Sequence, residues 1–200
     1  MKKWLLALFL ISLTQIGFAN TEINTNSEKI IKLANSGDSN AQLFLGSMYY
    51  DGNGVKQDYK LAIKWFSKAA EQGNIGAQFN MGYVYYWGKG VQQDYKLAAK
   101  WYTKAAEQGD VDAQFHIGFM YFEGKGVKQD YSLAANWFTK AAEQGEVVAQ
   151  LFLGSFHYYG KGVKQDYKLA KDLLINPAEQ GYALAQYLLG LIYDKGKGVK

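Results

Sequence analysis

Few residues in this chain have types and spacing that could do chemistry. The sequence has two histidines, His116 and His157, and no cysteine, so no ligand pair stands at metal-binding spacing. The G-K-G-V segments lack the spacing of phosphate-binding loops and follow helical patterns instead of strands. Among the 18 acidic residues, Asp51 and Glu123 are the candidates for general acid–base work, and no serine recurs beside a base. We therefore expect no metal, no cofactor and no catalysis.

A repeated segment organises the chain and must position any site. Its period is 36 residues, which is typical of stacked helical units. The equivalent alanines are Ala41, Ala77, Ala113, Ala149 and Ala185, and the equivalent glycines are Gly46, Gly82, Gly118, Gly154 and Gly190. In the second copy, apolar and small residues at helical spacing predict one helix over residues 77–86 and another over residues 95–108. We call these helix A and helix B of each copy.

Turn and cap signals separate helix A from helix B. In the second copy, Gly88 and Gly90 favour left-handed backbone conformations that end helix A. Asp94 can cap the free backbone N–H groups of helix B. Gly82 lies inside helix A, where glycine is costly, so it predicts a close approach by the alanine-rich side of helix B.

These residues carry a resemblance to a known family. The pattern A-Q-x-x-x-G-x-x-Y-x-x-G-x-G-V-x-x-D-Y-x-x-A-x-x-W-x-x-K-A-A-x-x-G resembles the Sel-one-like repeat, a branch of the tetratricopeptide (TPR-like) superfamily. The resemblance covers about residues 28–200 and implies an all-α fold, a right-handed α-solenoid of 36-residue helix-turn-helix repeats. It also implies protein–protein contacts, often in bacterial envelope or host settings. The cysteine-rich members of the family staple each repeat with a disulfide, which this chain cannot do.

The N-terminal segment differs in composition from the repeats. Lys2 and Lys3 precede an apolar run that ends at Leu13, and small residues occupy the positions that a signal peptidase reads before a cut after Ala19. We interpret residues 1–19 as a signal peptide, with an uncleaved signal anchor as the alternative. The protein is then expected to be periplasmic or secreted, without stable membrane insertion after cleavage.

The remaining chain divides into a leader and copies of the repeat. Pro177 replaces an alanine of the other copies and predicts a kink or break of helix B near Asn176. The predicted segments are a polar leader (20–27), an N-terminal half-repeat with helix B only (28–37), four repeats (38–73, 74–109, 110–145 and 146–181) and a partial fifth repeat with helix A only (182–200).

The charge of the chain is mildly basic. Its formal net charge is +4, and it contains no arginine, which argues against nucleic-acid binding. Lysines recur in the predicted loops and could form a basic edge that contacts acidic envelope components, although a solvated surface is the plainer interpretation. The loop lysines are Lys89, Lys125, Lys161 and Lys197.

The copies differ most along one side of helix A, which we call the helix A stripe. Spacings of three and four residues place its members on one helical face. They are Phe44, Ser47, Asp51, Asn80, Tyr83, Trp87, His116, Phe119, Glu123, Phe152, Ser155 and Tyr159. In the resembled superfamily this face lines a concave groove, so the stripe predicts an adaptor that binds a protein or peptide there. The alternatives are unconstrained surface, or a protein that binds or hydrolyses cell-wall fragments, as suggested for the cysteine-rich relatives.

Overall fold

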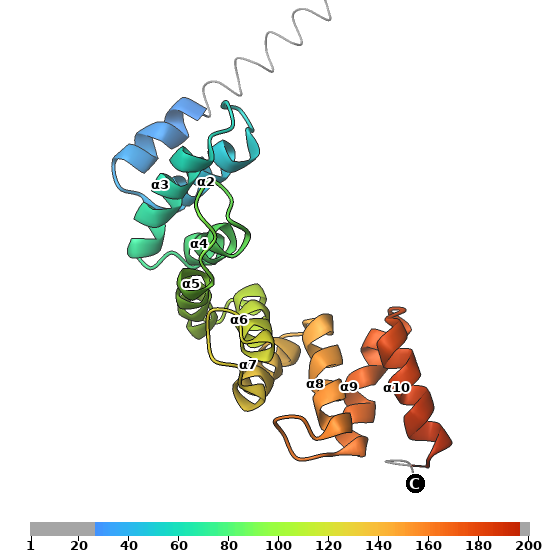
Figure 1. Ribbon diagram of the computed structural model, residues 1–200. Helices are drawn as coiled ribbons and strands as arrows, with labels where there is room; N and C mark the ends of the chain where they lie inside the picture. The colour runs from blue at the N-terminus through green and yellow to red at the C-terminus, as the bar shows by residue number, and fades with distance from the viewer. Residues whose placement is uncertain (1–26, 197–200) are drawn as a thin grey trace, which may run out of the picture. The chain divides into compact units, whose positions relative to one another are not determined.

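The computed structural model describes residues 27–196. The predicted signal peptide and residues 20–26 of the predicted leader lie outside the described residues. Within residues 27–196 the chain forms ten α-helices and no strand, so the fold is all-α (Figure 1). After a first helix over residues 27–35, the helices are α2 (Ser39–Asp51), α3 (Tyr59–Glu71), α4 (Ile75–Trp87), α5 (Tyr95–Glu107), α6 (Val111–Glu123), α7 (Tyr131–Glu143), α8 (Val147–Tyr159), α9 (Tyr167–Glu179) and α10 (Ala183–Asp194).

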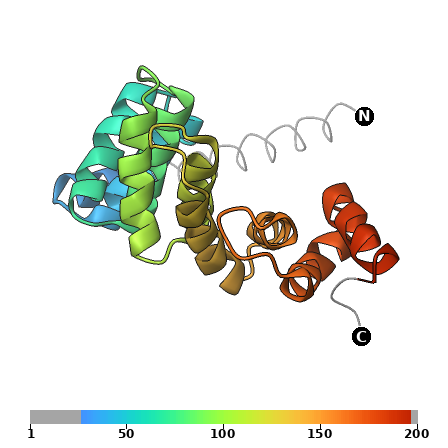
Figure 2. The ribbon, with the colours of Figure 1, turned by 60° about the horizontal axis from the view of Figure 1, so that its bottom comes forward.

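The helices alternate as the repeat predicts. The even-numbered helices from α2 to α10 are A helices, and the helix over 27–35, α3, α5, α7 and α9 are B helices. The chain divides into two compact units, Met1–Ala77 and Gln78–Lys200. In the first unit Ala34, Leu45 and Met48 form a core that Trp65 of α3 covers. In the second unit each helix from α5 to α10 packs against the next, and Figure 2 shows the last of these, from α8 in orange to α10 in red.

The predicted turn and cap signals are confirmed. Gly88 and Gly90 have φ values of +66° and +74°, in the left-handed region. The carboxylate of Asp94 accepts a hydrogen bond of 3.0 Å from the backbone N–H of Leu97 and so caps α5. The loop between them is closed by the side chain of Gln93, which donates to the carbonyl of Tyr86 at 2.7 Å.

The glycine inside helix A admits a large side chain of helix B. A Cβ atom on Gly82 would lie 2.6 Å from the ring of Tyr102, closer than the 3.0 Å below which Cβ atoms essentially never approach other heavy atoms. The prediction that helix B approaches this glycine is confirmed, but a ring makes the contact and not an alanine. The same pairs in other copies are Gly46 with Phe66, Gly118 with Phe138 and Gly154 with Leu174.

Buried glutamines connect neighbouring helices within each unit. The side chain of Gln114 on α6 donates to the carbonyl of Ala106 on α5 at 3.2 Å and accepts from the side chain of Gln144 on α7 at 2.9 Å. Gln42 and Gln72 repeat the second contact in the first unit at 2.7 Å. Since a buried amide without partners is costly, these bonds hold three successive helices in one register.

Pro177 does not break helix B of the fourth repeat. The helix α9 continues through it to Glu179, so the predicted break near Asn176 is wrong. The proline lies in the last helical turn, and its carbonyl accepts a hydrogen bond of 3.0 Å from the N–H of Tyr182. In the first repeat Ala69 makes the equivalent bond with Asn74 at 3.1 Å, so the C-terminal closure survives the substitution. The ring is buried where the other repeats have alanine.

Candidate functional site: the helix A stripe

The structure divides the helix A stripe into an outer and an inner set. Phe44, Trp87 and Tyr159 are 56%, 54% and 59% exposed, which is high for large apolar side chains. Asp51 and Glu123 are exposed as well. The inner members are half-buried, and they are Ser47, Asn80, Tyr83, His116, Phe119, Phe152 and Ser155. The surface that a partner can reach is therefore narrower than the sequence pattern indicates.

One position at the end of helix A alternates between a carboxylate and a ring. In the first four copies the equivalent residues, in chain order, are Asp51, Trp87, Glu123 and Tyr159, each the last residue of its helix, whereas the fifth copy has Lys195 directly after α10. Nothing in the repeat's core requires this alternation, because all four side chains are exposed. The position can therefore serve recognition, with rings for apolar contact and carboxylates for donors or cations.

The exposed rings are supported by buried neighbours. Trp87 packs edge-on against Tyr86, with ring centroids 5.1 Å apart at 71°. Tyr159 packs in the same manner against Tyr158, at 4.8 Å and 84°. Both supporting tyrosines are less than a tenth exposed. Rings held in this way lose little further freedom on binding, which is what a contact anchor needs.

The inner members belong largely to the hydrophobic core of the second unit. Phe119 and Phe152 from successive A helices meet edge-to-face at 5.7 Å. His116 stacks on Tyr102 with centroids 4.9 Å apart and 10° between the planes. Burial lowers the pKa of His116, against a smaller opposing effect of Asp112. The imidazole is therefore a packing residue that stays neutral at pH 7.

The candidate acid Glu123 is held by a lysine. Lys125 in the following loop lies 2.8 Å from its carboxylate, and that hydrogen bond raises the pKa of the lysine. The same ammonium lies 5.8 Å from the ring centres of Tyr86 and Tyr95. One loop lysine of the predicted basic edge is thus engaged within the protein. Lys161 repeats the ring contacts, at 4.1 Å from the ring centre of Tyr131 and 5.1 Å from that of Phe122.

Two features of residues 27–196 bear on other kinds of site. Nowhere in this range do three His, Cys, Asp or Glu side chains gather closely enough to hold a metal ion. None of the helices in the range is both long and apolar enough to span a membrane.

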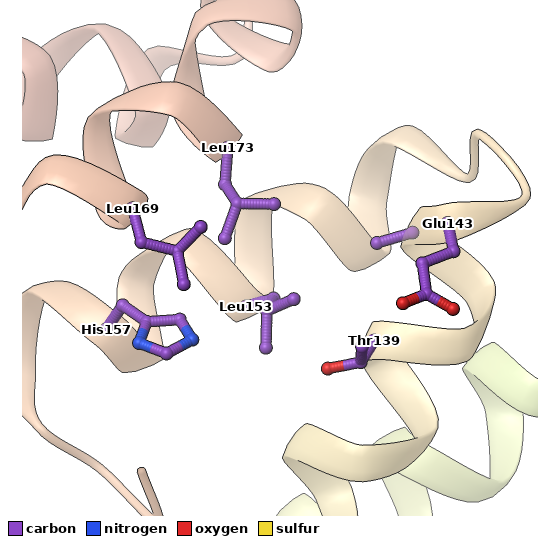
Figure 3. Close-up of a pocket in the computed structure, with 7 residues that line it drawn as sticks. Thr139, Glu143, Leu153, His157, Leu169 and Leu173 are labelled. Carbon is purple, nitrogen blue, oxygen red and sulfur yellow. The ribbon is translucent and has the colours of Figure 1, made fainter. Parts of the chain in front are cut away.

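Sequence reasoning missed one cavity, which lies on another side of the helices. It is open to solvent, has a volume of about 410 Å³ and is lined by residues of α7, α8 and α9 (Figure 3). His157 and Leu173 line it, and both depart from the repeat's usual tyrosine and tryptophan. These two departures were the signal available in the sequence, but only the fold shows that they adjoin.

Comparison with known proteins shows what the chain is similar to. The family model for the Sel1 repeat matches residues 39–74, 75–110, 111–146, 147–182 and 183–200. The crystal structure of a protective antigen with an SLR fold from uropathogenic Escherichia coli is 44% identical, with a TM-score of 0.81, and the match covers 85% of this chain and 36% of that one. A Sel1 repeat protein from Oxalobacter formigenes is 34% identical, with a TM-score of 0.78, and the match covers 92% of this chain and 78% of that one.

A further relative is the secretory immunoglobulin A-binding protein EsiB of Escherichia coli, 45% identical over 69 residues. That match covers 34% of this chain and 14% of EsiB, so the chain spans a small part of this relative. The family model, in contrast, matches the described repeats almost throughout. The chain therefore belongs to the Sel1 repeat family, whose fold is a TPR-like solenoid of helical repeats.

Proposed function

We propose that this protein is an exported, non-catalytic scaffold that binds another protein or a peptide along the helix A stripe, in the concave groove that stacked A helices are expected to form. The observation that carries the proposal is the alternation at the last position of helix A. There, supported and exposed rings at Trp87 and Tyr159 alternate with the carboxylates of Asp51 and Glu123.

The chemistry of this position defines the kind of partner. Exposed aromatic rings of this type are frequent anchors of protein interfaces, where they enter apolar pockets or cover apolar side chains. Carboxylates in the alternate copies favour cations and N–H donors of the partner. We therefore expect a segment that presents apolar side chains together with lysine or arginine. The relative EsiB is named for binding immunoglobulin A, which is a protein. This supports a protein as the partner proposed here.

Site-directed crosslinking tests the proposal. A photo-reactive residue at position 87 or 159 should capture one defined protein from native envelope or culture fractions. The control position is Leu133 on α7, which is 39% exposed but lies outside the stripe. The double variant Trp87→Ala/Tyr159→Ala should lose the captured partner, whereas Leu133→Ala should retain it. Equal capture by both variants would contradict the proposal.

Export needs a separate measurement, because the predicted signal peptide lies outside the described residues. The mass of the mature protein should correspond to a chain that begins at Asn20, and periplasm and culture supernatant should be assayed for it separately. A precursor of full length confined to the cytoplasm would contradict this part of the proposal.

The alternative, binding or hydrolysis of cell-wall fragments, gains no support from the geometry. Its candidate acid Glu123 forms an ion pair with Lys125 at 2.8 Å. Turnover of muropeptides by the purified protein, lost in Glu123→Gln, would nevertheless establish the alternative and overturn the scaffold.

A further inference from the structure

The open cavity between α7, α8 and α9 is distinct from the helix A stripe. Its lining is Thr139, Ala142 and Glu143 from α7, Leu153 and His157 from α8, and Leu169 and Leu173 from α9. Figure 3 shows Leu153 between the imidazole of His157 and Thr139, with Leu169 and Leu173 above them. Its volume of about 410 Å³ lies in the range of small-ligand pockets.

The cavity exists because two large side chains of the repeat are shortened in the fourth copy. At the equivalent place in the third copy, Tyr121 and Trp137 pack against the core formed by α5 and α6. His157 stands in place of that tyrosine and Leu173 in place of that tryptophan. The space that an indole occupies one repeat earlier is therefore open here.

The first unit shows the same filled arrangement. Tyr49 and Trp65 pack against the core that Ala34 and Leu45 form. Two independent copies thus place a tryptophan at this position against small and aliphatic residues. The space beside Leu173 is bounded by the same kinds of residue, because Ala142 and Leu153 occupy the core positions equivalent to Ala34 and Leu45.

Three of the side chains that line the cavity carry atoms that can accept a hydrogen bond. The hydroxyl of Thr139 donates to the carbonyl of Ala135 at 2.9 Å, which leaves its lone pairs free to accept. The Nδ1 atom of His157 lies 3.3 Å from the carbonyl of Lys164, which can only accept, so Nδ1–H donates to it; in the tautomer that carries its proton at Nδ1, the Nε2 atom is an acceptor. Figure 3 shows the second ring nitrogen on the side facing Leu153 and Thr139. The carboxylate of Glu143 adds a third acceptor.

We propose that this cavity is a second binding site, which accepts a tryptophan side chain protruding from a partner polypeptide. An apolar floor bounded by acceptors fits an indole, which has a large apolar ring and one N–H donor. Leu153 and His157 lie on the opposite side of α8 from Ser155 and Tyr159, as helical spacing requires. The site is therefore independent of the stripe and of the function proposed for it.

The test uses the full chain and a probe whose signal the protein does not contribute. The fluorine NMR signal of N-acetyl-5-fluorotryptophanamide is followed as protein is added. We expect saturable one-site binding with a dissociation constant of about millimolar, as for a ligand of this size. N-acetyl-leucinamide and N-acetyl-lysinamide, added as competitors, should not displace the probe at equal concentration.

Two variants that restore the repeat's own residues provide the specificity control. Leu173→Trp should fill the cavity and weaken binding about tenfold or more, the loss of one well-formed contact. His157→Tyr narrows the cavity from α8. It is the test variant to use if Leu173→Trp does not unfold cooperatively. Leu133→Ala, at the position of Leu169 one repeat earlier, should bind the probe unchanged. Absent saturation, displacement by the lysine or leucine probe, or unchanged binding in Leu173→Trp or His157→Tyr would overturn the proposal.

Discussion

Replacing Tyr102 by phenylalanine should stabilise the protein. Tyr102 is 0% exposed, and its hydroxyl is buried without a hydrogen-bond partner among the described residues. Burial, followed by the nearby Tyr86 and Tyr83, raises the pKa of the phenol above its usual range, so the group stays neutral at any working pH. The equivalent residues of the first and third repeats are Phe66 and Phe138.

The magnitude follows from the isolated hydroxyl. A buried polar group without a partner costs about 1–3 kcal/mol. Phenylalanine retains the ring that packs against Gly82 and the contacts with Phe79 at 5.5 Å and His116 at 4.9 Å. We therefore expect Tyr102→Phe to raise the free energy of unfolding by about 1–3 kcal/mol and Tm by about 2–4 °C per kcal/mol.

The assay is urea unfolding followed by circular dichroism, with the mirror substitution as a matched control. Phe138→Tyr places a hydroxyl at the equivalent buried position of the third repeat and should lower the free energy of unfolding by a similar amount. If Tyr102→Phe instead destabilises the protein while Phe138→Tyr is neutral, the hydroxyl of Tyr102 has a partner and the reasoning is wrong.

Three further predictions use the same unfolding assay. Gly82→Ala should lower the free energy of unfolding by about 1–3 kcal/mol, because the new Cβ would meet the Tyr102 ring. Gly190→Ala should raise it by about 0.5–1 kcal/mol, because nothing lies within 4 Å of a Cβ there. Equal effects of the two substitutions would contradict the packing argument. Tyr182→Asp should raise the free energy of unfolding by about 0.5–2 kcal/mol, because α10 begins without the side-chain cap of the other A helices. An unchanged free energy of unfolding would mean that a cap at this position does not stabilise the protein. Burial lowers the pKa of His116, so the stability that the neutral imidazole contributes should be complete above the unfolded-state pKa of about 6.5 and should fall as the pH drops below it. The variant His116→Phe should lack this pH-dependent loss of stability. Parallel pH profiles of the wild type and the variant would refute the burial of His116 as a neutral group.

Much of the fold follows from local patterns in the sequence. The left-handed glycines at 88 and 90 and the cap at Asp94 act over a few residues of backbone, so their signals are complete within the turn. Each of these local signals recurs every 36 residues, and this period indicates that the helical units stack on one another. The error at Pro177 was also local, because a proline in the last turn disturbs little of the helix that precedes it.

The candidate site was predictable only as a set of positions. Helical spacing placed twelve residues on one face, but it could not separate the exposed Trp87 from the half-buried Phe119. Burial at these positions depends on which rings a neighbouring helix supplies. Phe119 is covered because Phe152 of the next A helix reaches it, and that contact spans one whole repeat.

The sequence by itself determined that this protein is an all-α array of Sel1 repeats, because periodic glycines, caps and apolar residues each act through nearby backbone. Only the tertiary structure decided which side chains meet. In the tertiary structure the Tyr102 ring packs on Gly82, Lys125 pairs with Glu123, and a cavity lies beside His157 and Leu173. The physical reason is that close packing depends on the shapes of side chains brought together from several helices, and no spacing within one helix specifies those shapes.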